Sequence, residues 1–292
     1  MSVEPKNTFD IREFARTATG SHRDRLDLVQ FDVRPLGQST LRSLRYMRDL
    51  ERSTMRYLRT VLVTPTHKDA RVTAFLTTWA FEKYWVADAV DAMLARHEFQ
   101  PAQVSRQGAN GVVAWRRFSD RIAPIRRSLV DNTLGEDVVA VHMAAGTLDE
   151  LLCQAGYERL LSLDGHPELA RFLGEVLVIK ARHLEFFEAE AHDRLRGAPR
   201  AQRLAKVRLR RAGWPSSLDE DATPDAAFFF GHVLAPAPRL VDRIDRRIQT
   251  LPGLEQLALA RASVAASTLP RTPASLSGTW RRLTQSAFRS RT

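Results

Sequence analysis

The chain has 292 residues, of which 44% are hydrophobic, and it carries a formal net charge of +10. That length suffices for one large helical domain with additions or for two modest domains. The longest stretch without Asp, Glu, Lys or Arg, residues 226–238, is interrupted by prolines and falls short of the ~20 residues that a membrane-spanning helix needs. We therefore expect no transmembrane segment. Because the first residues lack the apolar run of a secretory signal, we expect a cytoplasmic protein.

Residues 1–38 are polar and lack a sustained period, so we interpret them as an N-terminal arm. Four long helices are predicted after the arm, because apolar residues recur at steps of three and four between Gly and Pro breaks. The turn between the third and fourth helices is short, which predicts an antiparallel pair, whereas the connection between the second and third is long and contains a further amphipathic helix at 112–130. The predicted ranges of the four helices are 39–63, 68–98, 136–163 and 167–196.

The rest of the chain is predicted to be a helical extension, residues 198–266, followed by a basic tail, residues 267–292. The tail is rich in Ser, Thr, Pro and Arg, a composition typical of disorder. The extension should contain shorter helices near 225–235, 238–250 and 253–266. No segment has the alternating pattern of a strand. The sequence therefore predicts an all-α protein, with an antiparallel four-helix bundle at 39–197 between the arm and the extension.

The positive charge is concentrated near the C-terminus. Residues 194–211 contain eight Lys or Arg and no acidic residue, and residues 256–292 contain six Arg and no acidic residue. The remainder of the chain therefore has a net negative charge. Both segments are candidates for contact with an acidic carrier-type protein or another polyanion, or they form solvated surface. Neither interleaves aromatic and basic residues as a platform for single-stranded nucleic acid does.

Each of the four long helices has one charged residue in the middle of an apolar stripe. In the first helix the stripe is Leu44, Met47, Glu51, Met55 and Leu58, and the other three stripes contain Glu82, Glu150 and Lys180. A single unpaired charge in a core costs several kcal/mol or is neutralised. We therefore predict that the four charged side chains meet one another, together with His183, in one interior layer.

Three segments resemble the ferritin-like superfamily, in particular its di-iron oxygenase and acyl-carrier desaturase branch. The segment Trp79-Ala80-Phe81-Glu82-Lys83-Tyr84-Trp85 is similar to a W-x-x-E-x-x-H motif, and Lys180-Ala181-Arg182-His183-Leu184-Glu185-Phe186-Phe187 is similar to E-x-R-H-x-x-F-F. Glu150 with Tyr157 is similar to the third helix of that family. The resemblance covers about residues 39–196. It implies a bundle whose core holds two metal ions between carboxylates and histidines.

The resemblance also implies that this metal site is degenerate. Glu51, Glu82, Glu150 and His183 occupy ligand positions, but Trp85 stands where a histidine is expected and Lys180 where a glutamate is expected. An indole offers no lone pair to a metal and would fill that side of the cavity, and a protonated lysine repels a cation. We therefore expect no cofactor, or iron or manganese if the site is still active.

Two further residues are candidates for lining this site. Tyr157 follows Glu150 by two helical turns, and His142 precedes it by two turns on the same face. The alternative for His142 is a surface histidine at a helix end. The alternative for His183 is a core histidine hydrogen-bonded to a neighbour. Cys153, the single cysteine, faces inward and is most simply a small apolar side chain.

Three functions remain open from the sequence. The first is an accessory or binding protein built on a degenerate ferritin-like site. The second is a metal-dependent oxidoreductase, di-iron or mononuclear, that acts on a small or carrier-bound substrate. The third is a basic interaction protein that binds an acidic partner, nucleic acid or a membrane surface. The sequence contains no phosphate-binding loop, dinucleotide-binding motif or H-E-x-x-H motif, and it leaves a homo-oligomer open.

Overall fold

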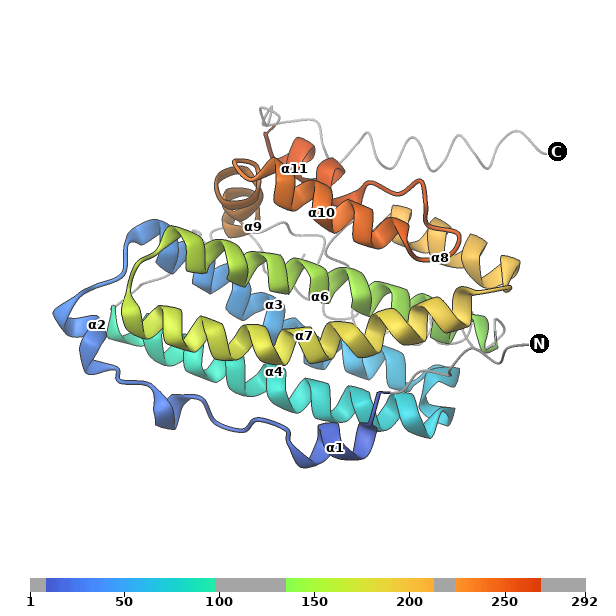
Figure 1. The fold of residues 1–292 in the computed structure, drawn as a ribbon, viewed down its shortest axis with the longest axis horizontal. Helices are drawn as coiled ribbons and strands as arrows, with labels where there is room; N and C mark the ends of the chain where they lie inside the picture. Colours follow the sequence, from blue (N-terminus) through green and yellow to red (C-terminus); the bar gives the residue numbers. More distant parts are fainter. Residues whose placement is uncertain (1–8, 98–134, 213–223, 269–292) are drawn as a thin grey trace, which may run out of the picture.

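The computed structural model describes residues 9–97, 135–212 and 224–268, and every regular element in these ranges is a helix (Figure 1). The all-α prediction is confirmed for this part of the chain. No helix in it combines the length and the apolar character needed to cross a bilayer. The predicted helix at 112–130 and nearly all of the predicted tail lie outside the described residues.

Four long helices form the centre of the molecule, and their ends lie within two residues of the predicted ones. Helix α4 begins where the Asp69 carboxylate accepts a hydrogen bond from the Val72 amide, and α7 begins where His166 accepts one from the Leu169 amide. Proline at the first position of α7 has the backbone angle that a helix start requires. The four helices are α3 (Gln38–Leu62), α4 (Ala70–Arg96), α6 (Asp137–Leu163) and α7 (Pro167–Leu195).

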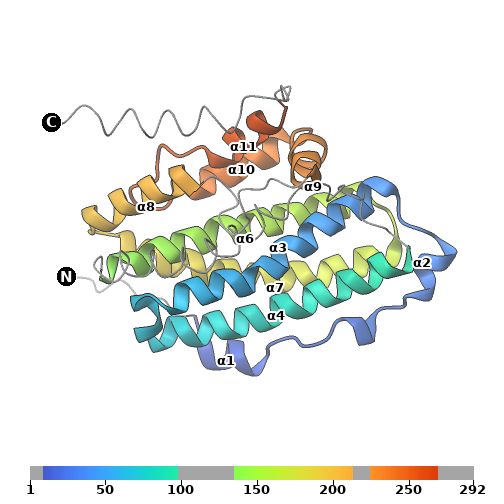
Figure 2. The same ribbon diagram turned by 180° about the vertical axis from the view of Figure 1, so that it is seen from behind.

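The long helices form two antiparallel pairs, α3 with α4 and α6 with α7 (Figures 1 and 2). Arg48, in the first half of α3, pairs with Asp91 near the end of α4. His142, near the start of α6, hydrogen-bonds Thr66 just before α4, so α4 and α6 run in the same direction. That direction agrees with the long connection predicted between these two helices.

Helix α6 lies at the centre because it is apolar on every side. All its side chains from Val138 to Cys153 are buried, which requires cover on each face. Part of that cover is a C-terminal layer of shorter helices (Figure 1). The layer consists of α8 (Pro199–Ala212), α9 (Pro224–Phe228) with a π-helical turn (Phe229–Leu234), α10 (Pro238–Gln249) and α11 (Leu259–Thr268).

Two expectations for the C-terminal third need correction. The basic segment 194–211 is not merely solvated surface, because α8 buries Ala201, Ala205 and Leu209. The helix expected at 253–266 begins only at Leu259, because Gly253 has a φ of 82° and interrupts the chain with a turn.

The N-terminal arm runs along α4 and α7 and belongs to the core (Figure 1). It contains α1 (Ile11–Arg16), a 3-10 turn (Arg23–Arg25) and α2 (Val29–Val33). Phe14 and Phe31 are buried. Arg182 of α7 donates hydrogen bonds to the Phe14 carbonyl oxygen at 3.2 Å and to the Thr17 hydroxyl at 2.8 Å. The arm therefore closes this side of the bundle.

Candidate functional site

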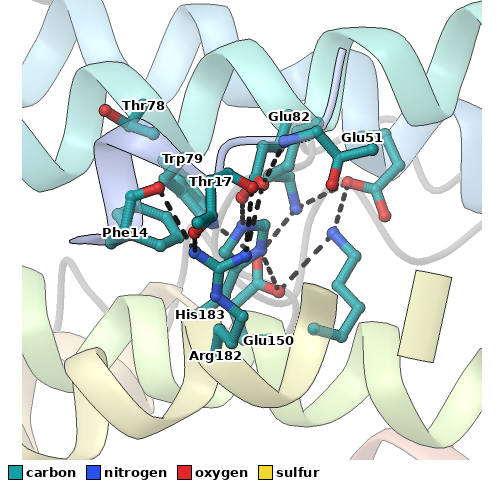
Figure 3. A network of polar contacts seen from close by, with 12 residues as sticks. Phe14, Thr17, Glu51, Thr78, Trp79, Glu82, Glu150, Arg182 and His183 are labelled. Carbon is teal, nitrogen blue, oxygen red and sulfur yellow. Dashed lines mark hydrogen bonds and ion pairs between the residues drawn. The ribbon is translucent and has the colours of Figure 1, made fainter. Parts of the chain in front are cut away.

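A layer of charged side chains crosses the interior of the bundle (Figure 3). Each of its members is at most 3% exposed, and together they come from all four long helices. We call this set the charged layer. It consists of Glu51 of α3, Glu82 and Lys83 of α4, Glu150 of α6, and Lys180 and His183 of α7.

Two ammonium groups bridge the same two carboxylates. Lys180 Nζ lies 2.8 Å from Glu51 Oε2 and 3.5 Å from Glu150 Oε2. Lys83 Nζ lies 2.9 Å from Glu51 Oε2 and 2.9 Å from Glu150 Oε1. Negative and positive groups therefore alternate around a closed ring. Every ion in it has a partner of opposite sign, as burial of charge requires.

His183 connects this ring to the third carboxylate. Its Nε2 lies 2.7 Å from Glu82 Oε2, and its Nδ1 lies 3.5 Å from Glu150 Oε2. Both ring nitrogens thus face carboxylate oxygens, which only accept hydrogen bonds when ionised. The Nε2 atom hydrogen-bonds Glu82, whereas Nδ1 and Glu150 Oε2 form no hydrogen bond at their separation of 3.5 Å. The charged layer thus combines three carboxylates, two ammonium groups and one imidazole.

Neutral donors complete the coordination of the carboxylates. Trp79 Nε1 donates to Glu150 Oε1 at 2.8 Å, and the Tyr157 hydroxyl donates to Glu51 Oε1 at 2.9 Å. The backbone amide of Thr19, in the N-terminal arm, donates to Glu82 Oε1 at 2.8 Å. The arm thus contributes directly to the charged layer.

The neighbouring cations shift the carboxyl groups toward ionisation. Burial raises the pKa of Glu51, but Lys180 and Lys83 outweigh it and hold that pKa below its ordinary value. Burial also raises the pKa of Glu150, but Lys180, Lys83 and His183 outweigh it and hold that pKa well below its ordinary value. Burial raises the pKa of Glu82 as well, but the hydrogen bond from His183 outweighs burial, so that pKa is also below its ordinary value.

Lys83 is held in its charged form by the same contacts. Burial lowers its pKa, but the carboxylates of Glu150 and Glu51 outweigh burial, and that pKa lies well above its ordinary value. Cys153 Sγ lies 3.8 Å from Lys83 Nζ. Burial raises the pKa of the Cys153 thiol despite that neighbour, so the thiol is protonated and is a poor nucleophile.

These contacts do not fit a pair of resident metal ions. One oxygen of each of two carboxylates, Glu51 Oε2 and Glu150 Oε1, is hydrogen-bonded to an ammonium group. A divalent ion between them would face two positive charges in a dry interior. The described residues contain no group of three or more His, Cys, Asp or Glu arranged to hold a metal ion.

The structure brings together Glu51, Glu82, Glu150, Lys180 and His183 as the sequence predicts, but Trp85 differs. We expected its indole to fill one side of the interior site. Instead Trp85 is half-buried, and its ring contacts are with Phe81 and Tyr84, which are exposed. Trp79 is the tryptophan that contacts the charged layer.

His142 fits neither of the roles considered for it. It is buried, so it is not a surface histidine. Its Nδ1 lies 2.9 Å from the Thr66 hydroxyl, and its carbonyl oxygen accepts a hydrogen bond from Tyr57. It therefore joins α6 to the connection between α3 and α4, at the end of the bundle.

Three members or neighbours of the site are not predicted from the sequence: Lys83, Trp79 and Thr19. A signal for Lys83 was present, because it lies four residues after Trp79 on the apolar stripe of α4. No sequence signal identified Thr19, because it contributes its backbone amide and not its side chain. Comparison with known protein families found no family model that matches the chain, and comparisons with curated proteins and with solved structures found no match.

Proposed function

We propose that this chain is a ferritin-like four-helix bundle in which side-chain cations replace the metal ions, and that it works as a binding or accessory protein rather than as a redox enzyme. The motifs around Glu82, Glu150 and His183 support the ferritin-like part of the proposal. The directions of the four long helices are compatible with it. In this proposal Lys83 and Lys180 supply the positive charge that metals would otherwise supply.

The pair of ammonium groups between Glu51 and Glu150 carries the proposal. Removing either lysine from its place would leave the two buried carboxylates, Glu51 and Glu150, with a single ammonium group between them, a strongly unfavourable change. A metal ion would have to displace both. The charged layer is thus a self-sufficient structural core rather than a vacant ligand set.

One cavity beside the charged layer is small for an organic substrate. Among the described residues, a cavity of about 130 Å³ between α3 and α4 reaches the layer only at Glu51. At about 30 Å³ for each water, it has room for about four water molecules. A redox site for an organic substrate needs a larger volume beside the reacting groups.

Thermal unfolding with and without metal tests the proposal. The melting temperature of the wild-type protein should not change on addition of Mn²⁺ or of a chelator. In the double variant Lys83→Met/Lys180→Glu, both ammonium groups are removed and a carboxylate is gained. Mn²⁺ should therefore stabilise this variant, by about 2.7 kcal/mol at a metal concentration one hundred times the Kd.

The matched control is Lys83→Met/Lys180→Met, which loses the same two cations but gains no ligand. Mn²⁺ should stabilise it less than it stabilises the first variant. A wild-type melting temperature that falls when the chelator is added would contradict the proposal in favour of a working metal enzyme.

A further inference from the structure

Helix α8 presents only positive charge to its surroundings. It contains Lys and Arg but no acidic residue over its 14 residues. Its apolar residues Ala201, Ala205 and Leu209 are buried. At 3.6 residues per turn, Arg203 and Arg210 lie on the opposite side of the helix and are exposed.

Helix α10, in the same C-terminal layer (Figure 1), also has a buried apolar side and exposed arginines, although it contains Asp242 and Asp245 as well. It buries Val241, Ile244 and Ile248, and it exposes Arg239 and Arg246 on the opposite side. In each helix the two exposed arginines are seven residues apart, which is two turns, or about 10 Å along the axis. We call these four residues, Arg203, Arg210, Arg239 and Arg246, the arginine face.

The arginine face is not neutralised by the described part of the protein. None of its four members forms an ion pair there, whereas other arginines of the layer do: Arg200 pairs with Asp137, Arg243 with Glu158, Arg247 with Glu188 and Arg261 with Asp245. Three acidic residues of the layer pair with other arginines or are buried, and one of them, Asp242 of α10, lies 3.8 Å from Arg261. Asp225 is held by Arg42 and Arg45 of α3, and Asp245 is buried.

We propose that the arginine face binds the phosphate backbone of double-stranded nucleic acid without reading its base sequence. The guanidinium group matches a phosphate through two parallel hydrogen bonds, and all four members are arginine. Charge on two neighbouring helices of one layer suits an extended polyanion. Contacts to phosphates carry no base information, so this binding is independent of sequence.

Two other polyanionic surfaces fit the arginine face less well. A helix that inserts into a membrane surface needs a free apolar side, but the apolar sides of α8 and α10 are already buried. A platform for single strands needs exposed aromatic rings. The exposed aromatic side chains of the described residues, Phe81 and Tyr84, are on α4, which lies across the bundle from the C-terminal layer (Figures 1 and 2).

This inference goes beyond the proposed function and does not depend on it, since no residue of the charged layer takes part. If the protein proved to contain metal, the proposed function would be wrong but the arginine face could still bind nucleic acid. If the protein did not bind nucleic acid, the proposal of a metal-free core would be unaffected.

The test is binding of the full chain to a fluorescent DNA duplex of about 20 base pairs, followed by anisotropy over a range of salt concentrations. We expect affinity to fall steeply with salt. In the variant with Arg203, Arg210, Arg239 and Arg246 all changed to Gln, the slope of log K against log salt should become shallower by about 3 to 4, at about 0.9 for each lost phosphate contact.

The matched control changes Arg12, Arg23, Arg59 and Lys68 to Gln, which alters the net charge equally at exposed positions outside the layer. It should retain the wild-type slope. An equal loss in both variants, salt-independent binding, or no binding by the wild type would overturn the proposal. Tighter binding to polyglutamate or to anionic lipid vesicles than to the duplex would also overturn it, in favour of an acidic protein or a membrane.

Discussion

Glu82 and Lys83 are neighbours in the sequence, and both side chains reach the interior. Successive residues of a helix are rotated by about 100°, so Trp79 and Lys83 lie on one side of Glu82 and Trp85 lies about 60° away on the other side. The buried residues Phe75, Val86 and Val90 are on the Lys83 side. The side chain that the charged layer requires is therefore at position 83, and position 85 faces outward.

Removing either lysine should destabilise the protein. Lys83→Met and Lys180→Met each leave two buried carboxylates with one ammonium group in place of two, so each should lower the free energy of unfolding by about 3–5 kcal/mol. Chemical denaturation monitored by circular dichroism measures this quantity. The control is Lys68→Met at an exposed position, where a change within about 0.5 kcal/mol is expected. Interior variants as stable as the control would show that the ring of ion pairs has no structural role.

The carboxyl groups of the charged layer should make the fold labile to acid. The pKa values of Glu51, Glu82 and Glu150 are lowered in the folded protein from a reference of 4.5. Their contribution to stability is therefore present above about pH 4.5 and is lost as the pH falls through the folded values. The pKa of Lys83 is raised above 10.5, so its contribution is present below that pH and is lost only as the pH rises through the folded value.

Denaturation midpoints measured between pH 3 and pH 8 test this dependence. The free energy of unfolding should fall steadily below about pH 4.5. In the variant Glu150→Gln, one of the three titrating groups is missing, so the decline should be shallower. A midpoint that stays constant from pH 6 to pH 3 would be inconsistent with ionised carboxylates in the layer.

At the scale of the elements, close packing of α6 against its neighbours sets the position of the charged layer. A Cβ atom at Gly146 would lie 2.1 Å from a ring carbon of Phe187 on α7, so glycine allows these two helices to approach. At Gly174 of α7, by contrast, a Cβ atom would have no neighbour within 4 Å. The two positions form a natural pair for comparison.

Gly146→Ala should destabilise the protein by about 1–3 kcal/mol, because the aromatic ring must move within a packed core. Gly174→Ala should stabilise it by about 0.5–1 kcal/mol, because alanine loses less backbone entropy in a helix. Denaturant midpoints of the two variants measure both effects. Equal effects of the same sign at the two positions would mean that α6 and α7 do not approach as described.

The sequence predicts some elements far better than others. The four long helices are predictable because Pro and Gly mark their ends and each is a long apolar segment, although α6 is apolar on every side. Helix α8 is less evident, because it packs through Ala201, Ala205 and Leu209, two of which are too small to stand out among the basic residues. The hydrogen bond from the arm to the charged layer cannot be predicted from the sequence, because its donor is the backbone amide of Thr19.

At the scale of the whole molecule, charge is divided between an interior in which carboxylates are paired with lysines and a basic surface. The sequence predicts the convergence of Glu51, Glu82, Glu150, Lys180 and His183, because each is the charged or polar member of an apolar stripe. With Lys180 alone as the fixed cation, the three glutamates leave a charge of −2. Lys83 supplies the second fixed cation, and whether it points inward depends on the exact rotation of α4, which periodicity alone does not define.

Metal content of the wild-type protein tests the central claim most directly. The protein should be purified from cells grown with added iron and manganese, and the metal bound per chain should be measured by mass spectrometry of the elements. If Lys83 and Lys180 hold the carboxylates, the metal content should be far below one ion per chain. Two tightly held ions per chain, with Lys180 displaced from Glu51, would contradict the account.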